Sequence, residues 1–263
     1  MKTLSSWNAL LAAPAACDHL VQLYTSDDAL ASTVARFIEQ GLAAGEGVIG
    51  IMTGAHWTEI AGRLTAAGVD VAAARAGRQL LVCEASEMLN RFMVDGMPDR
   101  TAMRSTILGV LGSVREAGFS KVRAFGEMVD ILNRHGNLAA AIRLEELWNE
   151  LLDEQRIALL CAYAVDAFDR ESYKSTLPSI GQVHSHLMPV EDSDRLEHAI
   201  DRAFIDVFGV RGDTRLLKEL FVRQLPDTTA MPTAQAALLV LRDLDARLAD
   251  AVLERAASHY RAA

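Results

Sequence analysis

Short apolar runs alternate along the chain with longer segments in which apolar residues recur at helical spacing. The apolar runs are HLVQLY at 19–24, VIGIM at 48–52, LLVC at 80–83, VRAF at 122–125 and IALLCAYA at 157–164. Such nearly continuous apolar runs are typical of strands that are buried on both faces. Strands and helices that alternate in this way predict an α/β fold with a mainly parallel sheet flanked by helices.

The segments between the apolar runs predict helices. Their expected ranges are Ala29–Ala44, His56–Ala67, Glu87–Val94, Arg100–Ala117, Leu138–Leu152 and Asp166–Tyr173. In the Leu138–Leu152 helix, Trp148 lies with neighbouring leucines on one face, which we interpret as core packing rather than as a cofactor site. Glu145 and Glu146 of the same helix are expected to be solvated.

After Pro189 the chain continues as helical segments without intervening strands. We expect helices at Asp194–Phe208, Thr214–Gln224 and Ala234–Tyr260, which form a small all-helical C-terminal region. The last helix repeats apolar residues at alternating four- and three-residue steps, which predicts packing on the other tail helices or, alternatively, a homodimer through the C-terminal helix. The expected organisation is a loosely structured leader segment at 1–17, an α/β domain at 18–189 and a helical region at 190–263.

Composition and charge narrow the class of protein. Hydrophobic residues make up 51% of the 263 residues, which allows a sizeable core, and the net charge is −9. Direct nucleic-acid binding is not expected, because nonspecific phosphate contacts need a concentrated basic surface. No apolar run approaches the roughly 20 residues that span a bilayer, so we expect no membrane association. The three cysteines are widely spaced without a CxxC pair, which predicts free thiols in a reducing cytoplasm.

The chain contains no sequence of the phosphate-loop type, GxxxxGK[ST]. Its four lysines are Lys2, Lys121, Lys174 and Lys218, and none of them lies in a glycine-rich loop. The turn after the first predicted strand reads TSDD, whose carboxylates would repel a triphosphate. A GxGxxG fingerprint, a GxSxG elbow and a local Ser/His/Asp set are also missing from the sequence. We therefore expect no cofactor, no metal and no enzymatic activity.

The carboxyl ends of the predicted parallel strands meet at one edge of the sheet, where open α/β sheets bind ligands. The candidate ligand-binding residues are Tyr24, Ser26, Asp27, Glu84, Glu127, Tyr163, His184 and His186. For Glu84, capping of the following helix is the favoured interpretation. For Glu127, capping and ligand recognition stay open alternatives, since Gly126 beside it leaves room for a ligand to approach the backbone.

Two histidines lie in a further predicted strand, Gln182–Met188. His184 and His186 are two residues apart, so in a strand both side chains would point to one face. Paired imidazoles can bind a metal, with Cys161 or Glu127 as further ligands only if the fold brings them close. We favour a structural or ligand-contacting role. His19, at the start of the first strand, is expected to be an edge residue that is hydrogen-bonded to a loop.

Four stretches together resemble the MEDS domain, a sensory domain named from methanogens, methylotrophs and the regulator DcmR. They read HLVQLYTSDDAL, FIEQGLAAGEGVI, FGEMVDILNRHGNLAAAIRLEELWNELL and IALLCAYAVDAF, and the resemblance covers about His19 to Ser179. It implies a RecA/KaiC-like fold that has lost the phosphate loop, and a module that recognises small molecules. The motif residues that carry over are His19, Gln22, Tyr24, Ser26, Gly126, Glu127, Glu145, Trp148, Cys161 and Tyr163.

The leading hypothesis is a non-enzymatic sensor that binds a small molecule at the carboxyl edge of the sheet and signals through its helical tail. In relatives the domain is joined to kinase, PAS or DNA-binding parts. We see no such part in this sequence, so a separate signalling partner, a kinase or a regulator, is expected. The alternative is a partner-binding regulator on a pseudo-ATPase scaffold. A metal-dependent enzyme that uses Glu127, His184 and His186 is the third hypothesis.

Overall fold

The computed structural model describes residues 4–188, 193–209, 214, 218–219 and 231–262. These residues form two compact units, one that ends at Ala164 and one that begins at Val165. We call them the sheet unit and the tail unit and describe each by itself. The domain boundary that the sequence predicts, at Pro189, lies outside the described residues.

Five strands of the sheet unit pair in parallel, in the order β3-β2-β6-β7-β1. Their bounds are β1 His19–Tyr24, β2 Gly47–Met52, β3 Leu80–Glu84, β6 Val122–Gly126 and β7 Ala158–Ala164. A small antiparallel hairpin, β4 Met93–Val94 with β5 Met97–Pro98, stands apart from them. Every residue of β1, β2 and β6 is buried, as the continuous apolar runs predict. The α/β fold with a mainly parallel sheet is confirmed, and its likeness to RecA and KaiC stays a prediction.

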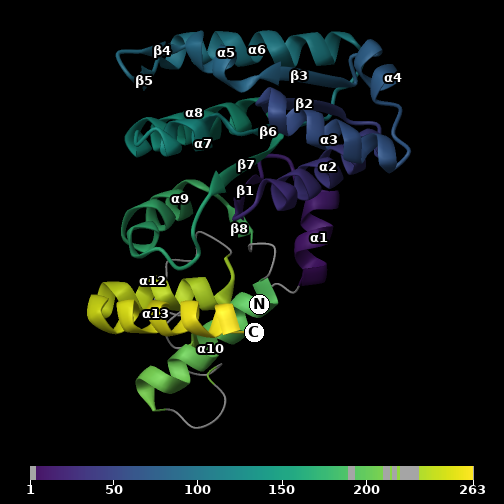
Figure 1. Ribbon diagram of the computed structural model, residues 1–263. Helices are drawn as coiled ribbons and strands as arrows, with labels where there is room; N and C mark the ends of the chain where they lie inside the picture. The colour runs from purple at the N-terminus through teal and green to yellow at the C-terminus, as the bar shows by residue number, and fades with distance from the viewer. Residues whose placement is uncertain (1–3, 189–192, 210–213, 215–217, 220–230, 263) are drawn as a thin grey trace. The chain divides into compact units, whose positions relative to one another are not determined.

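The helices of the sheet unit pack in two groups (Figure 1). One group is α1 Leu4–Ala12, α2 Asp27–Ala43, α3 Gly54–Ala66 and α4 Val71–Ala76. The other is α5 Ala85–Asn90, α6 Arg100–Glu116, α7 Met128–Arg134 and α8 Leu138–Gln155. Right-handed crossovers explain the division, because connections that step one way along the sheet place their helices on one face and connections that step back use the other.

The N-terminal segment is helical, so the expected loose leader is wrong. Helix α1 contains Trp7 and Leu11, whose side chains are only 6% and 4% exposed. Arg123 of β6 holds the end of this helix, because its guanidinium donates hydrogen bonds of 3.1 Å to the carbonyls of Leu11 and Ala12. The sequence did not predict this helix, because the apolar residues between Asn8 and Pro14 form little more than one helical turn and cannot show a helical period.

A buried ion pair fixes Arg123 at the amino end of its strand. The guanidinium is 1% exposed, and its Nε donates to the carboxylate of Glu46, which Lys121 also contacts. Burial alone would raise the pKa of Glu46, but the hydrogen bonds from Arg123 and Lys121 outweigh it and hold that pKa below its usual value. Phe37 adds a carbonyl acceptor at 3.1 Å and a ring beneath the guanidinium.

The tail unit is mainly helical, as expected. Its elements are a π-helix at Ser172–Thr176, α9 Leu177–Val183, β8 His186–Met188, α10 Ser193–Phe208, α12 Thr233–Leu244 and α13 Ala246–Ala262. The single helix predicted at Ala234–Tyr260 is wrong, because Asp245 breaks it with an extended backbone (φ −153°, ψ 98°). Leu244 and Leu248 beside the break are 60% and 36% exposed, so the predicted seam is not one continuous helix face. The predicted helix at Thr214–Gln224 lies mostly outside the described residues.

No helix in the described part of the chain combines the length and the apolar character that crossing a membrane requires.

Candidate functional site

The direction of the strand connections reverses between two neighbouring strands of the sheet unit. From β2 the chain passes through α3 to β3 on one side, whereas from β6 it passes through α7 and α8 to β7 on the other. β2 and β6 are paired directly, with Ile51 opposite Gly126. In open α/β sheets, ligands bind at the carboxyl ends of strands where the order reverses in this way.

Glu127 lies at this reversal, one residue past β6. Its backbone N–H donates to the carbonyl of Ile51 at 3.1 Å, and its side chain is 2% exposed. The carboxylate accepts hydrogen bonds from the backbone N–H of Thr53 and from Nδ1 of His56. Glu127 occupies the N-cap position of α7 but makes no side-chain cap bond there. Its charge instead lies at the amino end of α3, where a helix binds anions.

His56 connects this buried carboxylate to the surface. The ring is 14% exposed, and its Nε2 lies 3.5 Å from Oδ1 of Asp27, a side chain that is 73% exposed. The hydrogen bond from His56 to Glu127 raises the pKa of the imidazole and outweighs burial, which acts in the opposite direction; Asp27 adds to the rise. The imidazole therefore holds its proton between two carboxylates at a pH where an isolated histidine would lose it.

A second group of hydrogen bonds joins the ends of β1 and β7. The hydroxyl of Tyr24 donates to Oδ2 of Asp130 at 2.8 Å and accepts from Arg134, whose Nε also contacts Asp130 at 2.8 Å. Oδ1 of Asp130 accepts from the backbone N–H of Ala164 at 2.8 Å. Burial raises the pKa of Asp130 despite these donors, and burial together with Asp130 raises the pKa of Tyr24, which stays a hydrogen-bond donor.

Two glycines leave space beside these side chains. A Cβ atom built on Gly54 or on Gly126 would meet no atom within 4 Å. Gly54 is the first residue of α3, and Gly126 is the last of β6, so the open space lies at the strand reversal. We call the surrounding side chains the edge site. Its members are Tyr24, Asp27, Thr53, His56, Glu127, Asp130 and Arg134.

The structure brings Tyr24, Asp27 and Glu127 of the sequence candidates into the edge site. Ser26 and Glu84 are N-caps: Oγ of Ser26 accepts from the N–H of Ala29 at 3.3 Å, and Oε2 of Glu84 accepts from the N–H of Glu87 at 2.8 Å. The capping interpretation of Glu84 is thereby confirmed. For Glu127, capping of the following helix is wrong, because its side chain makes no cap hydrogen bond to α7.

Sequence reasoning missed His56, Asp130 and Arg134. A signal for His56 existed, because it lies one helical turn after Thr53, the residue that follows β2. Asp130 and Arg134 are spaced i, i+4 in α7, but this helix has only seven residues and was not predicted. A helix of seven residues is too short to show a periodic pattern of apolar residues. Its sequence instead predicted the end of a strand followed by a turn.

Tyr163 belongs to a different group, which lies inside the sheet unit rather than at its edge. Its hydroxyl donates to Oε1 of Glu145 at 3.0 Å, and Oε2 of Glu145 accepts from the thiol of Cys161 at 3.2 Å. Nε2 of His19 lies 3.2 Å from that same oxygen, and Nδ1 of His19 lies 2.7 Å from Oδ1 of Asn149. Burial and Glu145 raise the pKa values of Cys161 and Tyr163 well above their usual range. We call His19, Glu145 and Cys161 the buried trio.

Two expectations about the buried trio are wrong. Glu145 is 0% exposed instead of solvated, and His19 is 2% exposed and contacts Asn149 and Glu145 of α8 instead of a loop. Both errors have the same cause, because each polar side chain is satisfied by partners more than ten residues away in the sequence. The burial of Cys161 as a free thiol is confirmed.

His184 and His186 lie in the tail unit and do not share a strand face. α9 extends to Val183, so His184 caps a helix and its Nδ1 contacts the carbonyl of Ile180 at 2.8 Å. His186 begins β8, and its Nδ1 contacts Oγ of Ser185 at 2.9 Å. The expectation that both imidazoles point to one face of a single strand is wrong.

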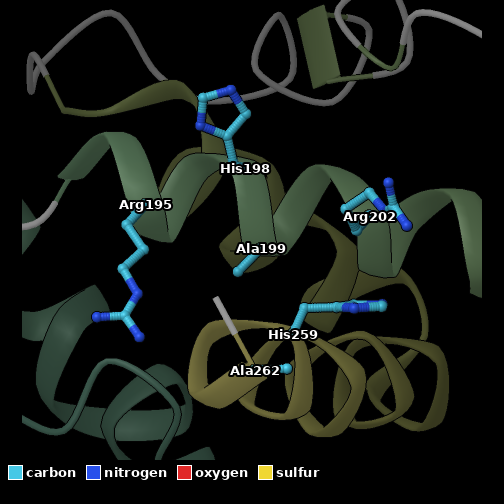
Figure 2. A pocket seen from close by; sticks show the side chains of 6 residues that line it. All are labelled: Arg195, His198, Ala199, Arg202, His259 and Ala262. Atoms are coloured by element: carbon cyan, nitrogen blue, oxygen red, sulfur yellow. The ribbon is translucent and has the colours of Figure 1, made fainter.

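The tail unit contains a basic hollow of about 620 Å³ between α10 and α13 (Figure 2). It is lined by Arg195, His198, Ala199, Arg202, His259 and Ala262. Arg195 donates to the carbonyl of Tyr260, and His259 pairs with Asp206 at 2.8 Å. Arg202 is exposed and has no such contact within the described residues.

A family model described as MEDS, the methanogen/methylotroph, DcmR sensory domain, matches residues 18–178. The matched range contains all five parallel strands of the sheet unit, the edge site and the buried trio. No curated protein matches the chain.

Proposed function

Because the chain belongs to the MEDS family of sensory domains, we propose that it acts in signal transduction by binding a small molecule at the edge site, without catalysing a reaction. The family description supports the sensory role, and the geometry of the sheet supports the place. The observation that carries the proposal is the strand reversal at β2 and β6, with open space at Gly54 and Gly126 beside Glu127.

The chemistry of the edge site favours recognition over catalysis. The carboxylate of Glu127 is engaged by two donors, Thr53 and His56, and the raised pKa of His56 favours the protonated form of its imidazole. Both oxygens of Glu127 already accept a hydrogen bond and its side chain is 2% exposed, so it is poorly placed to take a proton from a bound molecule. A protonated imidazole, a half-exposed Arg134 and the exposed Asp27 can instead orient a small polar molecule through hydrogen bonds.

Asp130 supplies a route for the signal. One of its carboxylate oxygens binds Tyr24 and Arg134 of the edge site, and the other binds the N–H of Ala164. Ala164 is the last residue of the sheet unit, and the chain continues from it into the tail unit. A ligand that competes for Tyr24 or Arg134 would change the hydrogen bonding of Asp130 and hence the position of this connecting residue.

Thermal unfolding in the presence of candidate ligands tests the proposal. We expect a small organic acid or hydrocarbon derivative, but no nucleotide, to raise the midpoint by about 5–10 °C at one hundred times its dissociation constant. His56→Gln and Glu127→Ala should remove most of the shift. Glu84→Ala is the matched control, because Glu84 also ends a strand but only caps its own helix, and it should keep the full shift. An equal shift in all variants would contradict binding at the edge site.

The basic hollow favours a second function, that of a partner-binding regulator. A concave surface with two arginines, on a chain whose net charge is −9, fits an acidic segment of another protein. We expect Arg202→Glu to weaken association with a co-purifying signalling partner at least tenfold. Arg255→Glu, at an exposed position of α13 outside the hollow, should leave it unchanged. Loss of the partner in both variants would indicate a general charge effect and contradict this role.

A further inference from the structure

We propose that the buried trio, His19, Glu145 and Cys161, binds a divalent transition-metal ion of the zinc class. The site is separate from the edge site, and it goes beyond the proposed ligand recognition. Its three potential ligand atoms are Nε2 of His19, Oε2 of Glu145 and Sγ of Cys161, and all lie within 4.8 Å of one another. Nitrogen, oxygen and sulfur donors together suit zinc and its neighbours better than magnesium or calcium, which take oxygen ligands.

The distances within the trio match those between the corners of a metal tetrahedron. Nε2 of His19 lies 3.2 Å from Oε2 of Glu145 and 3.4 Å from Sγ of Cys161. The distance from Sγ to Oε2 is 3.2 Å. Zinc bonds of about 2.0–2.3 Å in tetrahedral geometry require ligand atoms about 3.3–3.6 Å apart. The side chains therefore need to separate by only a few tenths of an ångström to admit the ion.

Two outer residues aim the ligand atoms at a common point. Asn149 Oδ1 is 2.7 Å from Nδ1 of His19, so it accepts a hydrogen bond from Nδ1–H, and the Nε2 lone pair then points toward the trio. Tyr163 donates to Oε1 of Glu145 at 3.0 Å, which leaves Oε2 facing His19 and Cys161. Hydrogen bonds of this kind orient the histidine and carboxylate ligands of metal sites.

Burial and charge also fit a metal ion. The three side chains are at most 2% exposed and come from the adjacent strands β1 and β7 and from helix α8. A thiolate and a carboxylate bring two negative charges into this interior, and a divalent cation neutralises both. The thiol proton leaves to solvent when the sulfur binds the ion.

Metal content and cobalt spectroscopy of the full chain test this site. The purified protein should bind about one zinc ion per chain, and replacement by Co²⁺ should give a thiolate-to-cobalt charge-transfer band. Cys161→Ser and Glu145→Gln should weaken zinc binding at least tenfold, and Cys161→Ser should abolish the band. Tyr163→Phe, which removes only one outer hydroxyl, should weaken binding about tenfold to a hundredfold.

Cys83→Ser is the matched control. Cys83 is a half-buried free thiol in β3, outside the trio, so its replacement should leave both the stoichiometry and the band intact. Circular dichroism shows whether each variant is folded, and Tyr163→Phe keeps the test decisive should Cys161→Ser unfold. The proposal is overturned if folded wild-type protein gives no charge-transfer band, or if Cys161→Ser and Tyr163→Phe bind the ion as tightly as the wild type.

Discussion

Replacement of Arg123 by alanine is expected to lower the free energy of unfolding by about 3–5 kcal/mol, because it leaves the buried carboxylate of Glu46 without its main partner. The guanidinium is 1% exposed and the carboxylate 4%. Removing one member of such a pair costs more than the pair itself contributes, since the remaining charge stays in a poorly solvating interior.

The same substitution frees the carbonyls of Leu11, Ala12 and Phe37, which all accept hydrogen bonds from Arg123. Those of Leu11 and Ala12 lie at the end of α1, so we also expect this helix to loosen from the sheet unit. Limited proteolysis near Pro14, or hydrogen exchange of the α1 amides, would detect this loosening well below the global transition.

Lys121→Ala provides the control for Arg123→Ala, because both cations contact the same carboxylate. Lys121 is 63% exposed, so its removal should cost no more than about 1 kcal/mol. Guanidinium denaturation of the two variants measures the difference directly. Equal losses would show that burial of Arg123 adds nothing to the pair. A double variant, Arg123→Met with Glu46→Leu, should recover part of the loss, since two apolar side chains leave no buried charge.

The fold class could be predicted because each strand is an almost purely apolar run and each long helix has a clear face. α2, α6 and α8 lie within three residues of their predicted ends. Short helices that cannot repeat an apolar period were not predicted, among them α1, α4 and α7. In the tail unit, apolar spacing continued smoothly through Asp245, and only the observed backbone shows that the helix stops there.

For the candidate site, the sequence predicted which residues lie at the strand ends but not which side chains they contact. Glu127, Tyr24 and Asp27 were predicted because they end an apolar run or follow one within three residues. What the carboxylate of Glu127 binds could not be predicted, because His56 is 71 residues away along the chain. The buried trio shows the same limit, since a glutamate in a helix reads as solvated until the fold places Tyr163 and His19 beside it.

Glu127→Gln is expected to lower the pKa of His56 and to destabilise the protein by about 1.5–3 kcal/mol at pH 6, the range of a hydrogen bond to a charged group. Glutamine keeps the size of the side chain and can still accept from the N–H of Thr53. It offers no negative charge to the imidazole, whose raised pKa comes first from its hydrogen bond to Glu127.

The sign of the pH dependence follows from this raised pKa. A group whose pKa is higher in the folded state adds stability that is complete below its unfolded value, about 6.5 for histidine, and that is lost as the pH rises through the folded value. The difference in unfolding free energy between wild type and Glu127→Gln should therefore be larger at pH 6 than at pH 9. Denaturation at both pH values, with an NMR titration of the His56 ring, measures it.

Asp27→Asn separates the buried carboxylate from the exposed one. Asp27 lies 3.5 Å from Nε2 of His56 but is 73% exposed, so water and salt screen its charge, and its loss should change stability by less than about 1 kcal/mol. If the two variants moved the His56 titration equally, the imidazole would be responding to surface charge in general. A larger effect of Glu127→Gln would mean that Glu127 sets the protonation of His56. A bound molecule that displaced Glu127 or His56 would then also change the protonation of His56.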